Sequence, residues 1–163
     1  MSEFPKLKNL RVLFVDDNRE MQRFLRSLLS SMDIVNIRGC SDAESCLQMM
    51  AEQPADIIIT DLVLGSGNGL DLIRRIRQAE RNVDYDTPIL VLTGQVSVAD
   101  VLAARDAGAT EFLAKPVSFG ALHDRLVWMI ENPRPFIKAV DFIGPDRRRR
   151  SAGGFGGTER RKR

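Results

Sequence analysis

Short apolar runs alternate with amphipathic segments from residue 10 to residue 131, and this alternation constrains the fold more than any other feature. Runs such as "RVLFV", "ADIIIT" and "PILVLT" are short and almost free of polar residues, which is typical of strands that are buried on both faces. The segments between them carry apolar residues at helical spacing, as Met21, Phe24, Leu25 and Leu28 do. The expected strands are residues 10–15, 34–39, 55–61, 88–93 and 110–115, and the expected helices are residues 19–31, 41–52, 68–79, 98–107 and 118–131.

Strands of this kind, separated by helices, indicate a parallel sheet whose two faces are both covered. Five such units predict a doubly wound α/β domain with a five-stranded parallel sheet and helices on both faces. Ser41 and Glu44 have the spacing of a capping box, which predicts that the second helix begins at Ser41. In domains of this class the ligand site lies beyond the carboxyl ends of the strands.

Polar and ionisable residues follow several of the expected strands at that edge. Asp16 and Asp17 end the first strand, Asp61 the third, Thr93 the fourth and Lys115 the fifth. Three carboxylates brought together repel one another unless a cation neutralises them. Carboxylate oxygens suit Mg²⁺, and a lysine with a hydroxyl group suits phosphoryl oxygens. The residues therefore predict a magnesium site at which a carboxylate accepts or holds phosphate.

Four motifs at these strand ends, "VDDN", "IIITD", "LTG" and "AKP", resemble the receiver domain of two-component response regulators. The resemblance covers residues 9–132 and implies the flavodoxin-like receiver fold. It also implies a function: a histidine kinase or phosphotransfer protein would transfer a phosphoryl group to the domain. The domain would then signal by phosphorylation-dependent contact with a downstream protein.

The resemblance assigns roles to individual residues. Asp61 would be the phosphoacceptor, and self-phosphorylation and autodephosphorylation there would be the only catalysis. Asp17 and Asp61 would bind Mg²⁺ together with the backbone carbonyl of Val63, and Asp16 would act through a metal-bound water. Thr93 would hydrogen-bond the phosphoryl group.

Lys115 would pair with the phosphoryl group electrostatically, and the bond before Pro116 is expected to be cis. Phe112 matches the aromatic switch position, although an aromatic residue on a short strand also serves as ordinary core. The fourth helix, fifth strand and fifth helix would form the surface that contacts the target or a second copy of the chain. Val63 and Gln95 occupy positions that tune phosphoryl hydrolysis in this family.

Two alternatives stay open at this point. A haloacid-dehalogenase-like phosphatase also uses strand-end carboxylates, Mg²⁺ and an aspartyl phosphate. Its nucleophile lies on the first strand with a second Asp two residues later, whereas Asp16 and Asp17 are adjacent here. The other alternative is a receiver-like interaction module whose basic tail binds a polyanion.

Charge divides the chain into a receiver at residues 1–132, with 14 basic and 19 acidic residues, and a tail at residues 133–163, with 10 basic and 3 acidic residues. The tail is Gly- and Arg-rich, is expected to be partly flexible, and is too short for a DNA-binding output domain, which favours a single-domain response regulator. Its apolar residues favour docking on this receiver, on a second copy or on another protein. Nucleic acid is the less favoured partner. The cluster that would contact it is Arg147, Arg148, Arg149 and Arg150.

The expected location is the bacterial cytoplasm. The chain shows no signal sequence and no apolar run of membrane-spanning length, which argues against membrane insertion. Cys40 and Cys46 lack the spacing of a zinc site and are expected to be ordinary residues with reduced thiols. His123 is the single histidine, and no chemistry is assigned to it.

Overall fold

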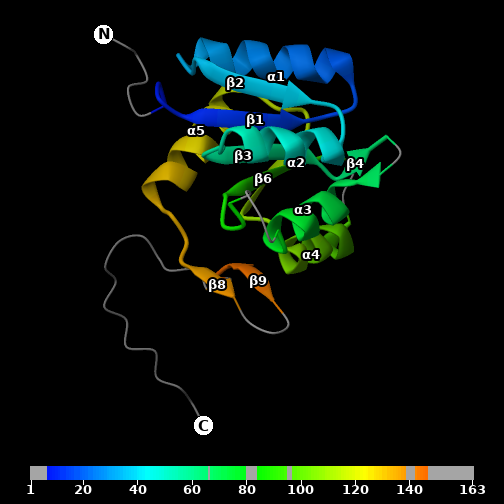
Figure 1. The fold of residues 1–163 in the computed structure, drawn as a ribbon. Coiled ribbons are helices and arrows are strands. Elements are labelled where there is room, and N and C mark those ends of the chain that lie inside the picture. Colours follow the sequence, from blue (N-terminus) through cyan, green and yellow to red (C-terminus); the bar gives the residue numbers. More distant parts are fainter. Residues whose placement is uncertain (1–6, 66, 80–83, 95–96, 139–141, 147–163) are drawn as a thin grey trace.

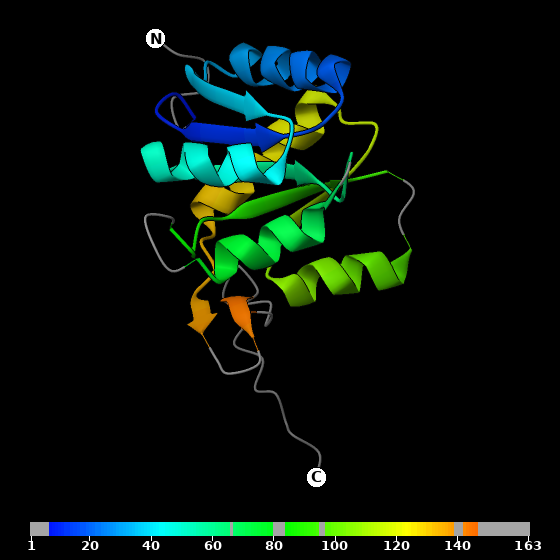
Figure 2. The same cartoon turned by 45° about the vertical axis from the view of Figure 1, so that its right-hand side comes forward.

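A five-stranded parallel sheet forms the centre of the protein, with helices on both faces (Figures 1 and 2). The computed structural model describes residues 7–65, 67–79, 84–94, 97–138 and 142–146. The strands of the sheet are β1 (Arg11–Val15), β2 (Asn36–Cys40), β3 (Ile57–Asp61), β6 (Ile89–Thr93) and β7 (Glu111–Ala114). The helices are α1 (Arg19–Ser31), α2 (Ala43–Glu52), α3 (Gly69–Arg77), α4 (Val98–Ala107) and α5 (Phe119–Glu131). The predicted doubly wound α/β class is confirmed.

The strands lie in the order β2-β1-β3-β6-β7. The chain adds β2 on one side of β1 and all later strands of the sheet on the other side, so the strand order reverses once, between β1 and β3. These two strands pair in parallel, with Val15 opposite Thr60. The residues that follow β1 and β3 therefore meet at the edge where a doubly wound sheet places its ligands. The topology thus brings Asp16 and Asp61 to one edge.

Each face of the sheet has its own core. Leu25 and Leu29 of α1 pack with Leu122 and Leu126 of α5 against side chains such as Phe14 on one face. The residues of the other core include Cys46, Met50, Leu72, Ile73, Ile76 and Ala104, which lie on α2, α3 and α4. Neither Cys40 nor Cys46 forms a disulfide, and both are buried.

Several element boundaries differ from those predicted. The strand β2 begins at Asn36 rather than at residue 34, although Ile34 is buried in the core. The helix α2 is capped by Asp42 rather than by Ser41, because the Asp42 carboxylate accepts bonds from both the backbone N–H and the hydroxyl of Ser45, at 2.8 and 3.0 Å. Asn68, expected to be the first residue of the third helix, is instead its N-cap.

Two short antiparallel hairpins were not predicted. The first joins β4 (Val63–Leu64) and β5 (Gly67–Asn68) directly after Asp61. The second joins β8 (Phe136–Lys138) and β9 (Ile143–Pro145), and we call the described residues 133–138 and 142–146 the C-terminal hairpin. It lies below α3 and α4 in Figure 1, so this apolar part of the tail packs on the receiver of its own chain.

Three expectations concern residues outside those described: the glycine-rich end of the tail, the position of Gln95, and the arginine cluster at residues 147–150. None of the described helices is both long and apolar enough to cross a membrane.

Candidate functional site

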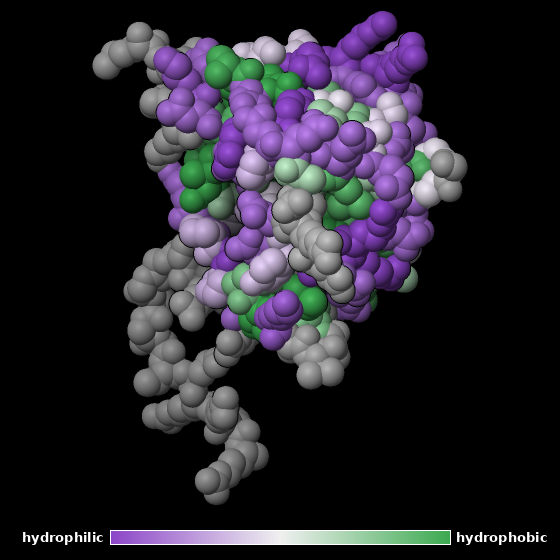
Figure 3. Space-filling model, in the orientation of Figure 1, coloured by the Kyte–Doolittle hydropathy of each residue, from purple (hydrophilic) through white to green (hydrophobic). Residues whose placement is uncertain are grey.

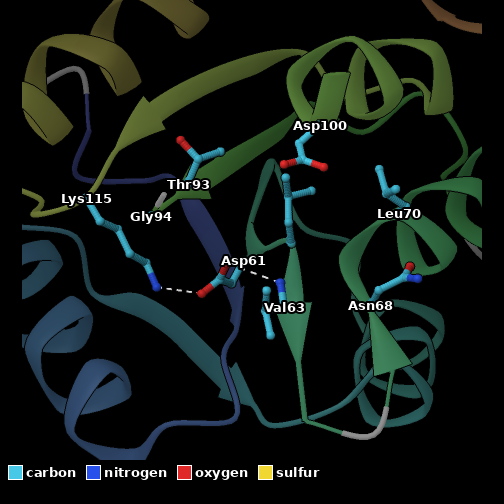
Figure 4. Close-up of a pocket in the computed structure, with 9 residues that line it drawn as sticks. Asp61, Val63, Asn68, Leu70, Thr93, Gly94, Asp100 and Lys115 are labelled. Carbon is cyan, nitrogen blue, oxygen red and sulfur yellow. Dashed lines mark hydrogen bonds and ion pairs between the residues drawn. The ribbon is translucent and has the colours of Figure 1, made fainter. Parts of the chain in front are cut away.

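A pocket of about 370 Å³ opens at the carboxyl edge of the sheet, between β3, β6 and the segments that follow them (Figure 4). Its lining residues are Asp61, Leu62, Val63, Asn68, Leu70, Thr93, Gly94, Asp100 and Lys115. The parallel strands bring Asp61, Thr93 and Lys115 together here as predicted, because each of them ends or directly follows a neighbouring strand. The pocket therefore combines a carboxylate, a hydroxyl group and an ammonium group.

Asp61 is held by two groups of its own chain. Lys115 Nζ donates to Asp61 Oδ2 at 2.5 Å, and the Val63 N–H donates to Asp61 Oδ1 at 3.2 Å (Figure 4). The backbone N–H of Lys115 also donates to the Thr93 carbonyl at 2.7 Å, which ties the end of β7 to the end of β6. The bond between Lys115 and Pro116 is cis, as predicted. Both oxygens of the candidate phosphoacceptor are thus engaged.

Asp16 is buried behind Asp61 and is incompletely compensated. Its Oδ1 accepts from the Asn18 N–H at 2.9 Å, whereas its Oδ2 has no hydrogen-bond partner. Lys115 Nζ lies 3.7 Å from that Oδ2, beyond hydrogen-bonding distance. Burial raises the pKa of Asp16, and the neighbouring Asp61 charge acts in the same direction. This carboxylate would be stabilised by a further cation.

Asp17 follows Asp16 directly, and its charge also helps to raise the pKa of Asp16. Asp17 is exposed, and its Oδ2 accepts a hydrogen bond from the Gly65 N–H at 3.0 Å. Within the described ranges, no three Asp, Glu, His or Cys side chains are grouped closely enough to hold a metal ion. The ligand set of Asp16, Asp17, Asp61 and the Val63 carbonyl therefore stays a prediction.

Gly69 fixes the position of the backbone at Asp61. A Cβ on Gly69 would lie 2.1 Å from the Asp61 carbonyl oxygen, so only glycine fits while α3 begins this close to β3. The Gly69 N–H also donates to the Leu62 carbonyl at 2.9 Å and closes the loop that contains β4 and β5. The close approach of the two backbones therefore explains why the second glycine of the "GNG" sequence, Gly69, carries no side chain.

The candidate switch residues lie on adjacent strands. Thr93 is buried at the end of β6, and Phe112 on β7 is half-buried against the core formed with α2, α3 and α4. Phe112 pairs with Val91 across the two strands. The switch roles of Thr93 and Phe112 stay predictions.

Two polar residues of the pocket, Asn68 and Asp100, were not identified from the sequence. Asn68 caps α3 by accepting from the Asp71 N–H at 2.7 Å. Asp100 completes the capping box of α4, because its Oδ2 accepts from the N–H and the hydroxyl of Ser97. Both could have been found as helix-start signals, "NGLD" and "SVAD", but those signals do not say that the caps face a pocket.

The fold and the pocket together define a doubly wound α/β domain with an acid, a lysine and a hydroxyl group at the carboxyl edge of its sheet. Residues 12–127 match the family described as response regulator receiver domain. This match covers most of the chain, and the chain therefore belongs to that family.

Several bacterial relatives support the assignment. The chain is 36% identical over 136 residues to the KDP operon transcriptional regulatory protein KdpE of Escherichia coli, covering 80% of this chain and 58% of KdpE. It is 28% identical over 119 residues to the chemotaxis protein CheY-3 of Vibrio cholerae, covering 73% of this chain and 90% of CheY-3. It spans only 16% of the sensory/regulatory protein RpfC of Xanthomonas campestris.

A solved structure gives the same result for the fold. The receiver domain of the sensor histidine kinase PA1611 from Pseudomonas aeruginosa, with a magnesium ion coordinated in its active site cleft, superposes with a TM-score of 0.68. It is 26% identical and covers 76% of this chain and 99% of that domain. The comparisons do not support a haloacid-dehalogenase-like phosphatase or a polyanion-binding module.

Proposed function

We propose that Asp61 is the phosphoacceptor of a two-component phosphorelay and receives a phosphoryl group from a histidine kinase or phosphotransfer protein. The observation that carries this proposal is the contact of 2.5 Å between Lys115 Nζ and Asp61 Oδ2, in a pocket that also contains Thr93. An ammonium group and a hydroxyl group beside the Asp61 carboxylate suit the negative oxygens of a phosphoryl group.

The transfer is a displacement at phosphorus. A carboxylate oxygen of Asp61 attacks the phosphorus atom of a phosphohistidine, the O–P bond forms, and the P–N bond breaks. The departing imidazole nitrogen takes up a proton from water. Lys115 then moves its charge from the carboxylate to the phosphoryl oxygens, and the Thr93 hydroxyl donates to one of them.

The carboxylates of the site fit Mg²⁺ by their chemistry. They offer hard oxygen ligands, and the buried Oδ2 of Asp16 has no hydrogen-bond partner. Asp17, Asp61 and the Val63 carbonyl would bind the ion directly, with Asp16 acting through a water. When bound, the ion neutralises the carboxylates and the phosphoryl oxygens during transfer.

Signalling follows from contact between proteins. Rearrangement at Thr93 and Phe112 alters the surface of α4, β7 and α5, and a downstream protein or a second copy of the chain reads that surface. The cytoplasmic location, the homodimer and the boundary between receiver and tail at Asn132 stay predictions.

The test is phosphorylation by acetyl phosphate with Mg²⁺, followed by intact mass spectrometry. We expect the full chain to gain one phosphoryl group, Asp61→Asn to gain none, and Lys115→Ala to be impaired. Asp124→Asn is the matched control, because the Asp124 side chain is 84% exposed on α5 and does not line the pocket. A phosphoryl group acquired by Asp61→Asn would refute the assignment.

A further inference from the structure

The C-terminal hairpin is fastened to β7 by an ion-pair network. Glu111, the first residue of β7, accepts from Arg134 Nη2 of the hairpin at 2.9 Å and from Arg125 Nη1 of α5 at 3.1 Å. The Glu111 side chain is only 12% exposed, so the two cations compensate a largely buried carboxylate. Glu111 thus links the hairpin and α5 to the start of β7.

A second set of contacts involves Arg77 at the end of α3. This buried guanidinium donates to the carbonyls of Gly108, Tyr85 and Thr87 at 2.9, 2.7 and 2.6 Å. Burial lowers the pKa of Arg77 to about 10, which leaves the side chain charged at neutral pH. Phe136 covers it, with Arg77 Cζ 5.1 Å from the ring centroid. The hairpin therefore closes a buried cationic site of the receiver.

Backbone packing joins the hairpin to α4. Gly108 ends α4 with a φ of 112°, and a Cβ there would lie 2.7 Å from the Ile143 carbonyl oxygen of β9. A Cβ on Gly144 would lie 3.0 Å from Gly108 Cα. Both positions exclude a side chain, so β9 lies directly against the end of α4. Apolar surface is also visible over β8 and β9 in Figure 3.

The elements that the hairpin fastens are those that carry the candidate switch. Thr93 and Lys115 lie at the carboxyl ends of β6 and β7, whereas Glu111, which the hairpin contacts, lies at the opposite end of β7, about 13 Å away for a strand of this length. In this arrangement Lys115 and Val63 engage both oxygens of Asp61. A phosphoryl group on Asp61 would compete with the carboxylate for Lys115, which directly follows β7.

We propose that the C-terminal hairpin is an intramolecular clamp that holds β7 and α4 in the arrangement seen here and thereby weakens phosphoryl binding at Asp61. The inference rests on the proposed function of Asp61. Because linkage is reciprocal, a phosphoryl mimic bound at Asp61 loosens the hairpin, and loosening the hairpin tightens binding of the mimic.

The experiment titrates the full chain with beryllofluoride in the presence of Mg²⁺, followed by fluorine NMR. The double variant Arg134→Gln/Phe136→Ala removes hairpin contacts with Glu111 and Arg77 without changing the receiver sequence. Gly144→Val separates β9 from α4 by an independent route. Lys138→Gln is the matched control, because Lys138 lies on the same hairpin with its Nζ 5.1 Å from the Tyr85 ring centroid, and the contacts of the described residues include none between Lys138 and either Glu111 or Arg77.

We expect the double variant and Gly144→Val to reach half-saturation at about one fifth of the beryllofluoride concentration that the wild-type chain needs, or below it. Lys138→Gln should need the same concentration as the wild-type chain. In the wild-type chain we expect beryllofluoride to speed hydrogen exchange of the Asp146 N–H, which donates to the Pro135 carbonyl at 2.7 Å. Equal or weaker binding by both hairpin variants would overturn the clamp while leaving the phosphoacceptor assignment intact. Failure of every chain to bind beryllofluoride or react with acetyl phosphate would overturn both.

Discussion

Two carboxylates at the ends of neighbouring strands, Asp16 and Asp56, illustrate at the residue scale how a structural acid differs from an acid of the site. Asp56 precedes β3 and accepts from the backbone N–H, Nε and Nη2 of Arg11 at 2.8, 3.2 and 3.0 Å. These bonds lower the pKa of Asp56, whereas burial raises the pKa of Asp16. Asp56, which joins β1 to the start of β3, is therefore hydrogen-bonded by Arg11 at both oxygens. Asp16, beside Asp61, has one oxygen without a hydrogen-bond partner and would be stabilised by a cation.

The stabilising role of Asp56 predicts a pH-dependent effect. Because the folded state lowers the pKa of Asp56, its contribution to the free energy of unfolding is present above the ordinary value of 3.8 and is lost as pH falls through the lowered value. We expect Asp56→Asn to cost about 1 kcal/mol at pH 7, a modest figure because the pair is partly exposed. Near pH 2 the cost should largely disappear.

Urea unfolding at the two pH values measures this difference. Asp71→Asn is the matched control, since Asp71 forms an exposed pair with Arg74 at 3.4 Å and should change stability little. A cost for Asp56→Asn that is the same at both pH values would assign the effect to packing rather than to charge.

At the scale of elements, the alternation of apolar runs with segments of helical spacing predicted the five sheet strands and the five helices, although β2 (Asn36–Cys40) is largely half-buried. It could not predict β4, β5, β8 and β9, which have only two or three residues each and are defined by pairing. The candidate site was predictable for a similar reason. Residues that follow parallel strands must meet at one edge, whatever the details of their side chains.

Contacts between distant segments could not be predicted. Nothing in the sequence indicates that Asp17 bonds the Gly65 N–H, or that Arg77 is buried beneath Phe136. The choice of Asp42 over Ser41 as the cap of α2 is also a tertiary matter, because the Ser41 hydroxyl instead accepts from Gln22 Nε2 of α1 at 3.0 Å. Both residues are good caps by composition.

The two candidate caps give a direct test at this scale. Asp42→Ala should lower the free energy of unfolding by about 1 kcal/mol, because it removes an N-cap and two bonds to Ser45. Ser41→Ala should cost a few tenths of a kcal/mol, because it removes one exposed side-chain bond. Thermal unfolding of the two variants compares them, and a larger loss for Ser41→Ala would restore the predicted capping box.

At the scale of the whole molecule, the family match and the folded body end at different places. The match to the receiver family ends at residue 127, whereas described contacts with the body continue to Gly144, which lies against Gly108. Glu111, Arg77 and Gly108 all lie inside the family match and contact the hairpin outside it. The hairpin therefore lies outside the matched receiver domain, whereas the residues that it contacts lie within that domain.

This difference predicts the outcome of two truncations. A chain ending at Asp146 keeps every described contact of the hairpin, so its free energy of unfolding should match that of the full chain within about 0.5 kcal/mol. A chain ending at Asn132 loses the Arg134 pair and the burial of Phe136, which should cost about 2 kcal/mol. Hydration of the uncovered Arg77 offsets part of that cost, because a charged group regains water.

Urea unfolding of the three chains, with the midpoint and the slope both fitted, measures these differences. The shorter chain should also unfold with a smaller slope, since less surface is buried in its folded state. Equal stability of all three chains would place the boundary of the folding unit at Asn132. A loss already present in the chain ending at Asp146 would show that residues 147–163 stabilise the fold, and the clamp would then have to include them.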